Sequence, residues 1–451
     1  MERLALKDLV AWDDDPHRKP LMVYGARQVG KTYLIRDIFA KTYYPNKYIY
    51  ISFKFDDDIR DYVNGEGSYK RPTSNASKIL NHISLWKNTV IDEHTLLIFD
   101  EIQEALPAIT ALKDFKENHP NIRIIASGSL VRIKIARKSK DRKKFFYPVG
   151  ALDELMMFPM NFEEYLLNAN PILLKQIQTA YAEKCPLDES AHQLALDTLH
   201  EYMLVGGLPE NVKIYLQSKS LVKVRKNLRT IYRDYLNDIA LYDAPMDTLL
   251  RTRKLFESLY IEINRPLSEF RPSLFDPGKK VRDYFLPVSL LKLGEVIYQA
   301  RRTNEHVSIP LKEDNDSDYR LYCLDTGFLA YQSDIALVDF QKSNNTNMGV
   351  FFENYIACEL ACRGVGLFYW KGKNNAEFEF LVKQGEEIIP IDVKKRRGNL
   401  TSMNAYASHN RVEMFVKVSS NHYGYDDEHK ILTMPLYAFF LFVRDIAVDF
   451  E

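Results

Sequence analysis

The segment YGARQVGKT, at residues 24–32, constrains the fold of this chain more than any other feature. Its spacing of glycine, four residues, glycine, lysine and threonine is the signature of a loop that wraps phosphate groups. The apolar run LMV precedes it, and the amphipathic segment YLIRDIF follows it. The motif therefore predicts a strand, a phosphate-binding loop and a helix in succession, which is the beginning of a parallel α/β domain.

Each residue type in this loop has a physical role in binding a nucleotide. Glycine allows the backbone to curve so that successive N–H groups face the phosphates, and the helix that follows adds the positive end of its dipole. We expect Lys31 to reach the terminal phosphates of ATP, and the Thr32 hydroxyl to bind Mg²⁺. The predicted nucleotide-binding residues are Gly25, Ala26, Arg27, Gln28, Val29, Gly30, Lys31, Thr32 and Tyr33.

Two further strands supply the other groups that such a site needs. LLIFDEIQ (96–103) ends in Asp100, which we expect to hold Mg²⁺, and in Glu101, which we expect to polarise the attacking water. RIIAS (123–127) is followed by Gly-Ser, so Ser127 and Ser129 are candidates for orienting that water. Of these two we include Ser129 with Glu101 and Lys31 among the predicted catalytic residues. A plain Ser-Gly-Ser turn is the alternative.

Hydrolysis by such sites usually also needs an arginine near the terminal phosphate. The segment after Ser129 is rich in cations, and its members are Arg132, Lys134, Arg137, Lys138, Lys140, Arg142, Lys143 and Lys144. They could supply an arginine to a neighbouring subunit, grip a nucleic-acid backbone, or form a solvated loop. The sequence does not single out one arginine.

Hydrophobic periodicity divides the chain into three parts. Apolar strands alternate with helical segments through residues 1–165, which predicts an α/β fold with a parallel sheet. Residues 166–340 read mainly as helices, with a turn at GGLPE (206–210) and a small β-wing near residue 320. After a polar linker, residues 341–451 read as an α+β module.

Composition narrows the class of protein. Lys+Arg and Asp+Glu are 61 each, so any DNA-binding surface must be a local patch rather than an overall charge. No apolar run approaches the ~20 residues of a membrane helix. The four cysteines lack the ligand spacing of a zinc site. We therefore expect a cytoplasmic protein without a membrane partner.

The chain resembles a known group, the prokaryotic AAA+-like P-loop ATPases that carry a C-terminal domain of unknown function. The matching segments are RKPLMVYGARQVGKT (18–32), LLIFDEIQ (96–103), ASGS (126–129), FPMNFEEYL (158–166), GGLPE (206–210), YRLYCLDTGFLA (319–330), FFENYIACEL (351–360) and FEFLVKQGEEIIPIDVKKR (378–396). The resemblance implies a P-loop NTPase domain, helical and winged-helix-like segments, and a C-terminal module similar to the restriction-endonuclease (PD-(D/E)xK) fold.

A restriction-type module raises the question of nuclease chemistry. Such a site uses carboxylates to hold magnesium and a lysine to place the nucleophile. Here the candidates are Glu353, Glu379, Asp392 and Lys394. Family members usually carry Asp at the position of Glu379, and the longer side chain would move the metal. An inherited fold that binds DNA or protein without cutting is the alternative.

These observations favour an Mg-ATP-dependent ATPase that acts as a switch or motor on DNA or on a DNA-bound partner. The alternatives are an ATP-regulated nuclease and an ATP-gated interaction module that does not hydrolyse ATP. Cations of the middle region (Arg251, Arg253, Lys254, Lys279, Lys280 and Arg282) could belong to a winged-helix DNA reader or to exposed helix surfaces. A homo-oligomer is expected only by analogy with related rings.

Overall fold

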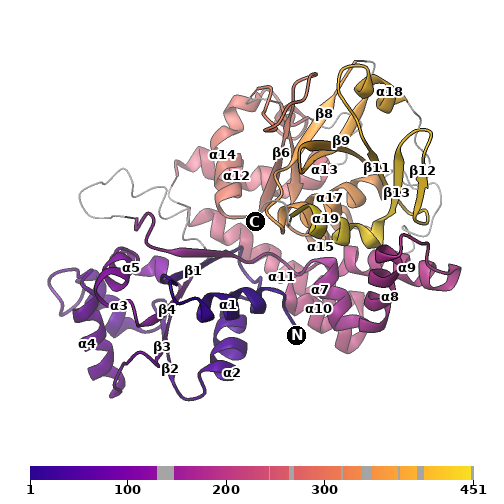
Figure 1. The fold of residues 1–451 in the computed structure, drawn as a ribbon. Helices are drawn as coiled ribbons and strands as arrows, with labels where there is room; N and C mark the ends of the chain where they lie inside the picture. Colours follow the sequence, from indigo (N-terminus) through magenta and orange to yellow (C-terminus); the bar gives the residue numbers. More distant parts are fainter. Residues whose placement is uncertain are drawn as a thin grey trace. The chain divides into compact units, whose positions relative to one another are not determined.

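The computed structural model of this chain describes residues 1–129, 147–242, 244–263, 269–315, 318–337, 339, 348–373, 376–393 and 401–447. It divides into two compact units (Figure 1). The first is Glu2–Phe158, and the second is Pro159–Glu451 together with Met1. Within the described residues, no helix has both the length and the apolar character that crossing a membrane requires.

A five-stranded parallel sheet forms the centre of the first unit, in the order β2-β3-β4-β1-β5. Its strands are β1 (Leu21–Tyr24), β2 (Tyr48–Ser52), β3 (Leu96–Asp100), β4 (Arg123–Ser127) and β5 (Asp153–Met156). Every residue of β1 and β3 is buried, as expected for strands covered on both faces. The parallel α/β fold predicted for this part is confirmed. Edge strand β5, whose sequence DELM lacks an apolar run, was not predicted.

Helices cover this sheet where the amphipathic segments predict them. The π-helix η1 follows the phosphate loop, and α4 and α5 lie between the strands. The helices of the unit are α1 (Ala5–Asp14), η1 (Tyr33–Ala40), α2 (Lys41–Tyr43), α3 (Asp57–Asn64), α4 (Ala76–Lys87), η2 (Ile102–Glu104) and α5 (Leu106–Asn118). Side chains of α5 such as Leu112 and Phe115 pack with Phe99 in one core, which holds the ends of the strands in place.

The second unit begins with helices, as the loss of a strand pattern after residue 165 predicts. They are α7 (Phe162–Ala169), α8 (Pro171–Ala182), α9 (Glu189–Val205), α10 (Pro209–Ser218), α11 (Leu221–Ala240), α12 (Met246–Glu257), α13 (Leu259–Ile263), η3 (Pro272–Leu274), η4 (Val281–Tyr284), α14 (Phe285–Leu293) and α15 (Thr326–Ser333). The motif GGLPE forms the tight connection between α9 and α10.

An eight-stranded mixed sheet completes this unit, in the order β12-β13-β11-β10-β9-β8-β6-β7. Its strands are β6 (Ile297–Arg302), β7 (Tyr319–Cys323), β8 (Phe368–Lys371), β9 (Glu377–Gln384), β10 (Glu387–Val393), β11 (Phe415–Ser419), β12 (Gly424–Asp426) and β13 (Ile431–Pro435). Its accompanying helices are α17 (Met348–Ala361), α18 (Thr401–Ala407), η5 (Leu436–Ala438) and α19 (Phe439–Ala447). Of the small β-wing expected near residue 320, one strand is β7. Its antiparallel partner β6 lies mostly in a stretch that reads as helical in the sequence, so that part of the prediction is wrong. The two strands form one edge of the large sheet because β6 also pairs with β8.

Two short motifs that are far apart in the sequence meet in the second unit. The Gly207 N–H donates to Asp325 Oδ2 at 2.6 Å, and Asp325 also caps α15 by accepting from the Phe328 N–H at 3.1 Å. Met160 N–H donates to the Gly207 carbonyl at 2.6 Å. A Cβ added to Gly207 would lie 2.0 Å from the Met160 carbonyl oxygen. Glycine is therefore required here because two backbones approach closely.

A second buried carboxyl holds another pair of motifs together. Glu359 of α17 is 1% exposed and accepts from the Phe162 N–H, at the start of α7, at 2.8 Å. Burial raises the pKa of Glu359 to about 7 and the pKa of Asp325 to about 6. In the interior of the second unit, buried carboxyl groups thus connect these distant motifs by accepting hydrogen bonds from main-chain N–H groups.

We predict that Gly207→Ala destabilises the protein by about 3 kcal/mol or more, because the new methyl group must displace the Met160 main chain. Gly349→Ala is the matched control: a Cβ there meets no atom within 4 Å and lies in helix α17, where alanine is favoured over glycine. Denaturant unfolding measures both changes. Equal stability of the two variants would contradict this packing argument.

The buried Glu359 carboxyl predicts a pH dependence of stability. Its pKa rises from 4.5 when unfolded to about 7 when folded, so the folded chain binds the additional proton. Its contribution to the free energy of unfolding is fully present below the unfolded pKa and is lost as pH rises through about 7. In Glu359→Gln, whose Oε1 still accepts from Phe162, this fall should be smaller by on the order of 2 kcal/mol.

Unfolding midpoints measured between about pH 5 and about pH 7.5 test this difference in slope. Glu183→Gln, at an exposed position in the same unit, is the control and should keep the wild-type slope. An unchanged slope in Glu359→Gln would show that this carboxyl does not couple folding to pH.

Candidate functional site

The phosphate loop connects β1 to η1 with a sharply curved backbone. Gly25, Gln28 and Gly30 have positive φ angles of 146°, 64° and 92°. A Cβ on Gly25 would lie 2.2 Å from the Met157 carbonyl oxygen, so only glycine fits there. Backbone of this kind turns successive N–H groups toward a common centre, which favours an anion.

A residue that sequence reasoning missed supports the loop from outside. Arg3, 9% exposed, donates from Nη1 to the Val29 carbonyl at 2.7 Å and from Nη2 to the Phe158 carbonyl at 2.8 Å. One guanidinium therefore ties the middle of the loop to the last residue of this unit. No motif surrounds Arg3, so nothing in the sequence pointed to this role.

Lys31 lies inside the curve of the loop. The residue is 8% exposed, and its Nζ donates to the carbonyls of Gly25 and Ala26 at 2.7 and 2.8 Å. Of the other predicted nucleotide-binding residues, Val29 is buried, Arg27 is half-buried, and Gln28 and Tyr33 are exposed. The loop therefore holds a cation next to the N–H groups that would contact phosphate.

Asp100 is the centre of the polar contacts next to this loop. At 6% exposure, it accepts from Thr32 Oγ1 at 2.9 Å and from Tyr50 OH at 2.7 Å, both at Oδ2, and from Ser127 Oγ at 2.6 Å at Oδ1. Tyr50 and Ser127 lie on β2 and β4, the strands on either side of β3. The sheet order therefore brings a hydroxyl from each neighbouring strand, and one from the loop, onto the same carboxylate.

Tyr50 was not predicted as a site residue. Burial and the hydrogen bond to Asp100 raise the pKa of its hydroxyl well above the ordinary value, so it stays a donor at neutral pH. The Arg36 guanidinium lies over the Tyr50 ring, 5.1 Å from its centroid, and forms an ion pair with Asp37 at 2.7 Å. The tyrosine is thus held on its face as well as at its hydroxyl.

Glu101 occupies a strained backbone position immediately after Asp100. Its φ and ψ are 51° and 41°, the left-handed region that costs a residue with a Cβ about 1 kcal/mol. The buried Gln103 side chain donates to the Glu101 carboxylate.

Ser129, half-buried, lies two residues beyond the end of β4, whereas Ser127 is the serine that reaches Asp100. The cationic segment 132–144 lies outside the described residues.

The donor set next to the loop fits an Mg²⁺ ion that accompanies a nucleotide. Thr32 and Asp100 offer a hydroxyl and a carboxylate, and oxygen ligands are those that Mg²⁺ prefers. Among the residues that the structure describes, no group of three or more His, Cys, Asp or Glu is placed to hold a metal.

The expected nuclease-like residues lie in the second unit. Glu353 is on α17, Glu379 is on β9 and Asp392 is on β10, while Lys394 lies outside the described residues. Leu381 pairs with Pro390, so Glu379 and Asp392, each two residues away, share one face of the hairpin. Both are buried, and Glu379 Oε2 accepts from the Val393 N–H at 3.0 Å.

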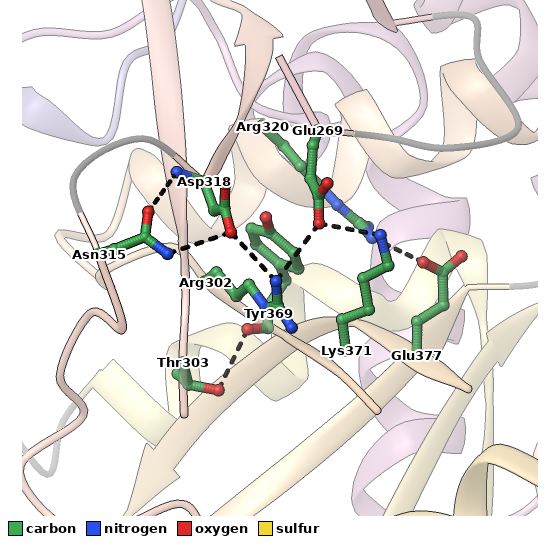
Figure 2. A network of polar contacts seen from close by, with 9 residues as sticks. All are labelled: Glu269, Arg302, Thr303, Asn315, Asp318, Arg320, Tyr369, Lys371 and Glu377. Carbon is green, nitrogen blue, oxygen red and sulfur yellow. Dashed lines mark hydrogen bonds and ion pairs between the residues drawn. The ribbon is translucent and has the colours of Figure 1, made fainter. Parts of the chain in front are cut away.

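A buried arginine from β7 supplies positive charge to these carboxylates. Arg320 is 3% exposed and donates from Nη2 to Glu377 Oε2 at 2.8 Å, with its guanidinium 4.2 Å from the Tyr369 ring centroid (Figure 2). Burial opposes its charge, but Tyr322, Glu377, Glu353 and Glu379 raise the pKa of Arg320 above the ordinary value. The carboxylates expected to hold magnesium are therefore already close to a fixed cation.

The cations around Arg320 are also paired. Lys371 donates to Glu269 at 2.9 Å, and Arg302 contacts Asp318 at 3.1 Å and Glu269 at 3.7 Å. Figure 2 shows how these side chains lie around Arg320. On α12, the candidate DNA-reading cations form ion pairs as well, namely Arg251 with Asp247, Arg253 with Glu257 and Lys254 with Asp276. These cations are therefore already paired with carboxylates, and exposed pairs of this kind contribute little to stability.

Comparison with protein families adds to this geometry. Residues 17–166 match the family described as AAA domain. This segment is an AAA-type P-loop ATPase domain. Residues 196–338 and 348–437 match two families described as domains of unknown function, DUF8612 and DUF4143. The latter description names no activity, so the likeness of this part to restriction endonucleases stays a prediction.

Solved structures show only distant similarity. The Walker-type ATPase PABY2304 of Pyrococcus abyssi is 14% identical, with a TM-score of 0.42 over 73% of this chain and 94% of that one. The Aeropyrum pernix ORC2 protein in its ADPNP-ADP complexes is 13% identical, with a TM-score of 0.33 over 80% and 96%. No curated protein matches the chain. The assignment therefore rests on the AAA family match and the loop and sheet geometry.

We predict that Arg320→Met destabilises the second unit by about 3 kcal/mol or more, because it leaves neighbouring buried carboxylates without a counter-charge. Arg411→Met is the control, since its ion pair with Glu413 involves an arginine side chain that is 86% exposed, and such pairs contribute little. Thermal and denaturant unfolding measure both. Similar stabilities would show that Arg320 does not balance this cluster.

Proposed function

We propose that this protein hydrolyses ATP in the presence of Mg²⁺ and acts as a nucleotide-dependent switch on DNA or on a DNA-bound partner. The observation that carries the proposal is the arrangement of three hydroxyl groups around Asp100, next to a lysine inside a phosphate loop. The AAA family match supports ATP as the nucleotide. The cytoplasmic location expected from the sequence stays a prediction.

In this proposal Lys31 and the loop N–H groups bind the terminal phosphates, and Lys31 exchanges its carbonyl partners for phosphate oxygens. Thr32 and Asp100 hold Mg²⁺, which when bound neutralises charge on the phosphates. Ser127 and Tyr50 keep Asp100 oriented, so both are positioning residues. Ser127 has the positioning role because its hydroxyl is bonded to Asp100, and Ser129 stays a predicted candidate for orienting the attacking water.

Glu101 is the proposed group that orients the attacking water. Its strained backbone fixes the direction in which the carboxylate leaves β3, and Gln103 holds the carboxylate itself. Gln103 belongs to η2, which precedes α5 directly. A change at Glu101 on hydrolysis would therefore reach α5 through one short helix, which is a physical route from nucleotide state to the rest of the unit.

Nuclease chemistry is not part of the proposal. The carboxylates that would bind its metal lie near the Arg320 guanidinium, which is a permanent positive charge. Experiment must distinguish this ATPase from an ATP-gated module that does not hydrolyse ATP. Experiment must also show whether the protein forms a homo-oligomer, in which a neighbouring copy could supply an arginine to the site.

We predict that Lys31→Ala lowers ATP turnover by about 10²-fold or more, because a donor to the terminal phosphates is lost. Glu101→Gln should keep ATP binding but lower turnover to a similar degree. Lys87→Ala, an exposed lysine of the same unit, is the control. Phosphate release, nucleotide binding and molecular mass in solution, each with and without single- and double-stranded DNA, are the measurements.

Wild-type turnover in Lys31→Ala would contradict the proposal. Nucleotide binding by the wild type with no phosphate release, even with DNA present, would favour the non-hydrolysing module instead.

A further inference from the structure

Helix α11 (Leu221–Ala240) carries an unusual distribution of charge. Its buried residues Val224, Leu228, Ile231 and Tyr235 face the core, which leaves the opposite side to solvent. The helix has five cations, of which Arg225 is half-buried, whereas Lys223, Lys226, Arg229 and Arg233 are exposed. The two acidic residues, Asp234 and Asp238, lie in the C-terminal half.

This distribution is the reverse of what stabilises a helix. The N-terminal end of a helix favours acidic side chains and the C-terminal end favours basic ones. Like charges three or four residues apart, such as Lys226 and Arg229 or Arg225 and Arg229, also repel each other. The cations of α11 therefore need an explanation other than the stability of the helix.

Three of these cations, Arg225, Lys226 and Arg229, line a cavity of about 690 Å³, which we call the α11 groove. Its walls come from α11, from Tyr331 and Gln332 of α15 and from Glu257 of α12, three helices labelled in Figure 1. The groove lies entirely within the second unit.

The groups in the groove differ in how far their charges are balanced. Arg225 forms an ion pair with Asp334 and lies 5.6 Å from the Tyr331 ring centroid. Lys226 and Arg229 are exposed, and among the described residues neither the Lys226 ammonium nor the Arg229 guanidinium forms a hydrogen bond or ion pair. Two cations thus remain for an anionic ligand, in contrast to the paired cations of α12.

Aromatic rings lie beside these cations. Tyr232 and Tyr331 approach at 5.3 Å between centroids, and Tyr232 stacks on Phe256 at 4.9 Å. Gln332 donates to the Tyr232 hydroxyl at 3.2 Å and to the Phe256 carbonyl at 2.6 Å, so the wall is fixed. A cationic side next to an aromatic wall suits a phosphate that carries a planar base.

We propose that the α11 groove binds single-stranded nucleic acid, with phosphates on Lys226 and Arg229 and an unpaired base against Tyr331. A duplex keeps its bases stacked inside and offers none to the tyrosine. This inference extends the proposed function by naming where the DNA partner binds. Its biological meaning rests on that function, although the binding itself does not require ATP hydrolysis.

The test is a fluorescence anisotropy titration of full-length protein with fluorescein-labelled oligo-dT at several salt concentrations. Lys226→Glu/Arg229→Glu should weaken binding about 10-fold or more and reduce the salt slope by about 1.4, since two phosphate contacts are lost. Lys175→Glu/Lys184→Glu makes the same charge change at exposed sites of the same unit and should bind like the wild type.

Tyr331 tests the aromatic contact separately. Tyr331→Ala should weaken binding about 5-fold or more with an unchanged salt slope, and Tyr331→Phe should keep wild-type affinity because stacking needs only the ring. A thermal unfolding midpoint equal to that of the wild type would show that each variant keeps its fold.

Three results would overturn the inference: wild-type affinity in the Lys226/Arg229 double variant, tighter binding of a duplex of equal length, or complete competition by free dTMP at the same concentration as oligo-dT. Lys31→Ala should keep oligo-dT binding. A protein that binds oligo-dT but does not turn over ATP would therefore refute the proposed function and leave the groove assignment in place.

Discussion

The site in the first unit depends on a single carboxylate, Asp100, and on the hydroxyl groups that bond to it. Thr32, Tyr50 and Ser127 come from the phosphate loop and from the two strands that flank β3. These contacts exist only if the strands are parallel and ordered as they are, because the carboxyl ends of parallel strands meet at one edge of a sheet. The order of the strands in the sheet therefore determines which hydroxyl groups reach Asp100, so the site depends directly on the fold.

The second unit depends on buried polar groups in a different way. Asp325 and Glu359 accept hydrogen bonds from the main chain of distant segments, and Arg320 balances several carboxylates. Because an unpaired buried charge is costly, these contacts specify how α7, α9, α15 and α17 pack. The sequence motifs of this unit are therefore best understood as structural. The candidate functional feature of this unit is the α11 groove on its surface, because the charged groups of Lys226 and Arg229 have no hydrogen-bond or ion-pair partner among the described residues.

Local motifs were predictable from the sequence, and contacts between distant segments were not. The strand, loop and helix at residues 21–40 follow from one contiguous pattern, and Asp100 follows from the apolar strand that it ends. In the sequence, Tyr50 cannot be told from the other residues of its strand, because only the pairing of β2 with β3 places its hydroxyl at Asp100. Arg320 belonged to an expected wing, and only the pairing of β6 with β8 brings it near Glu377. Strand β5 is an edge strand whose half-exposed residues leave no hydrophobic pattern to detect.

The most direct test of this account is an experimental structure of the protein with Mg²⁺ and a non-hydrolysable ATP analogue. The account predicts that the Lys31 ammonium leaves the Gly25 and Ala26 carbonyls for the terminal phosphates. It also predicts that Thr32 and Asp100 turn toward the ion while Ser127 stays bonded to Asp100. A nucleotide bound away from residues 25–32, or an Asp100 that takes no part in holding the ion, would contradict it.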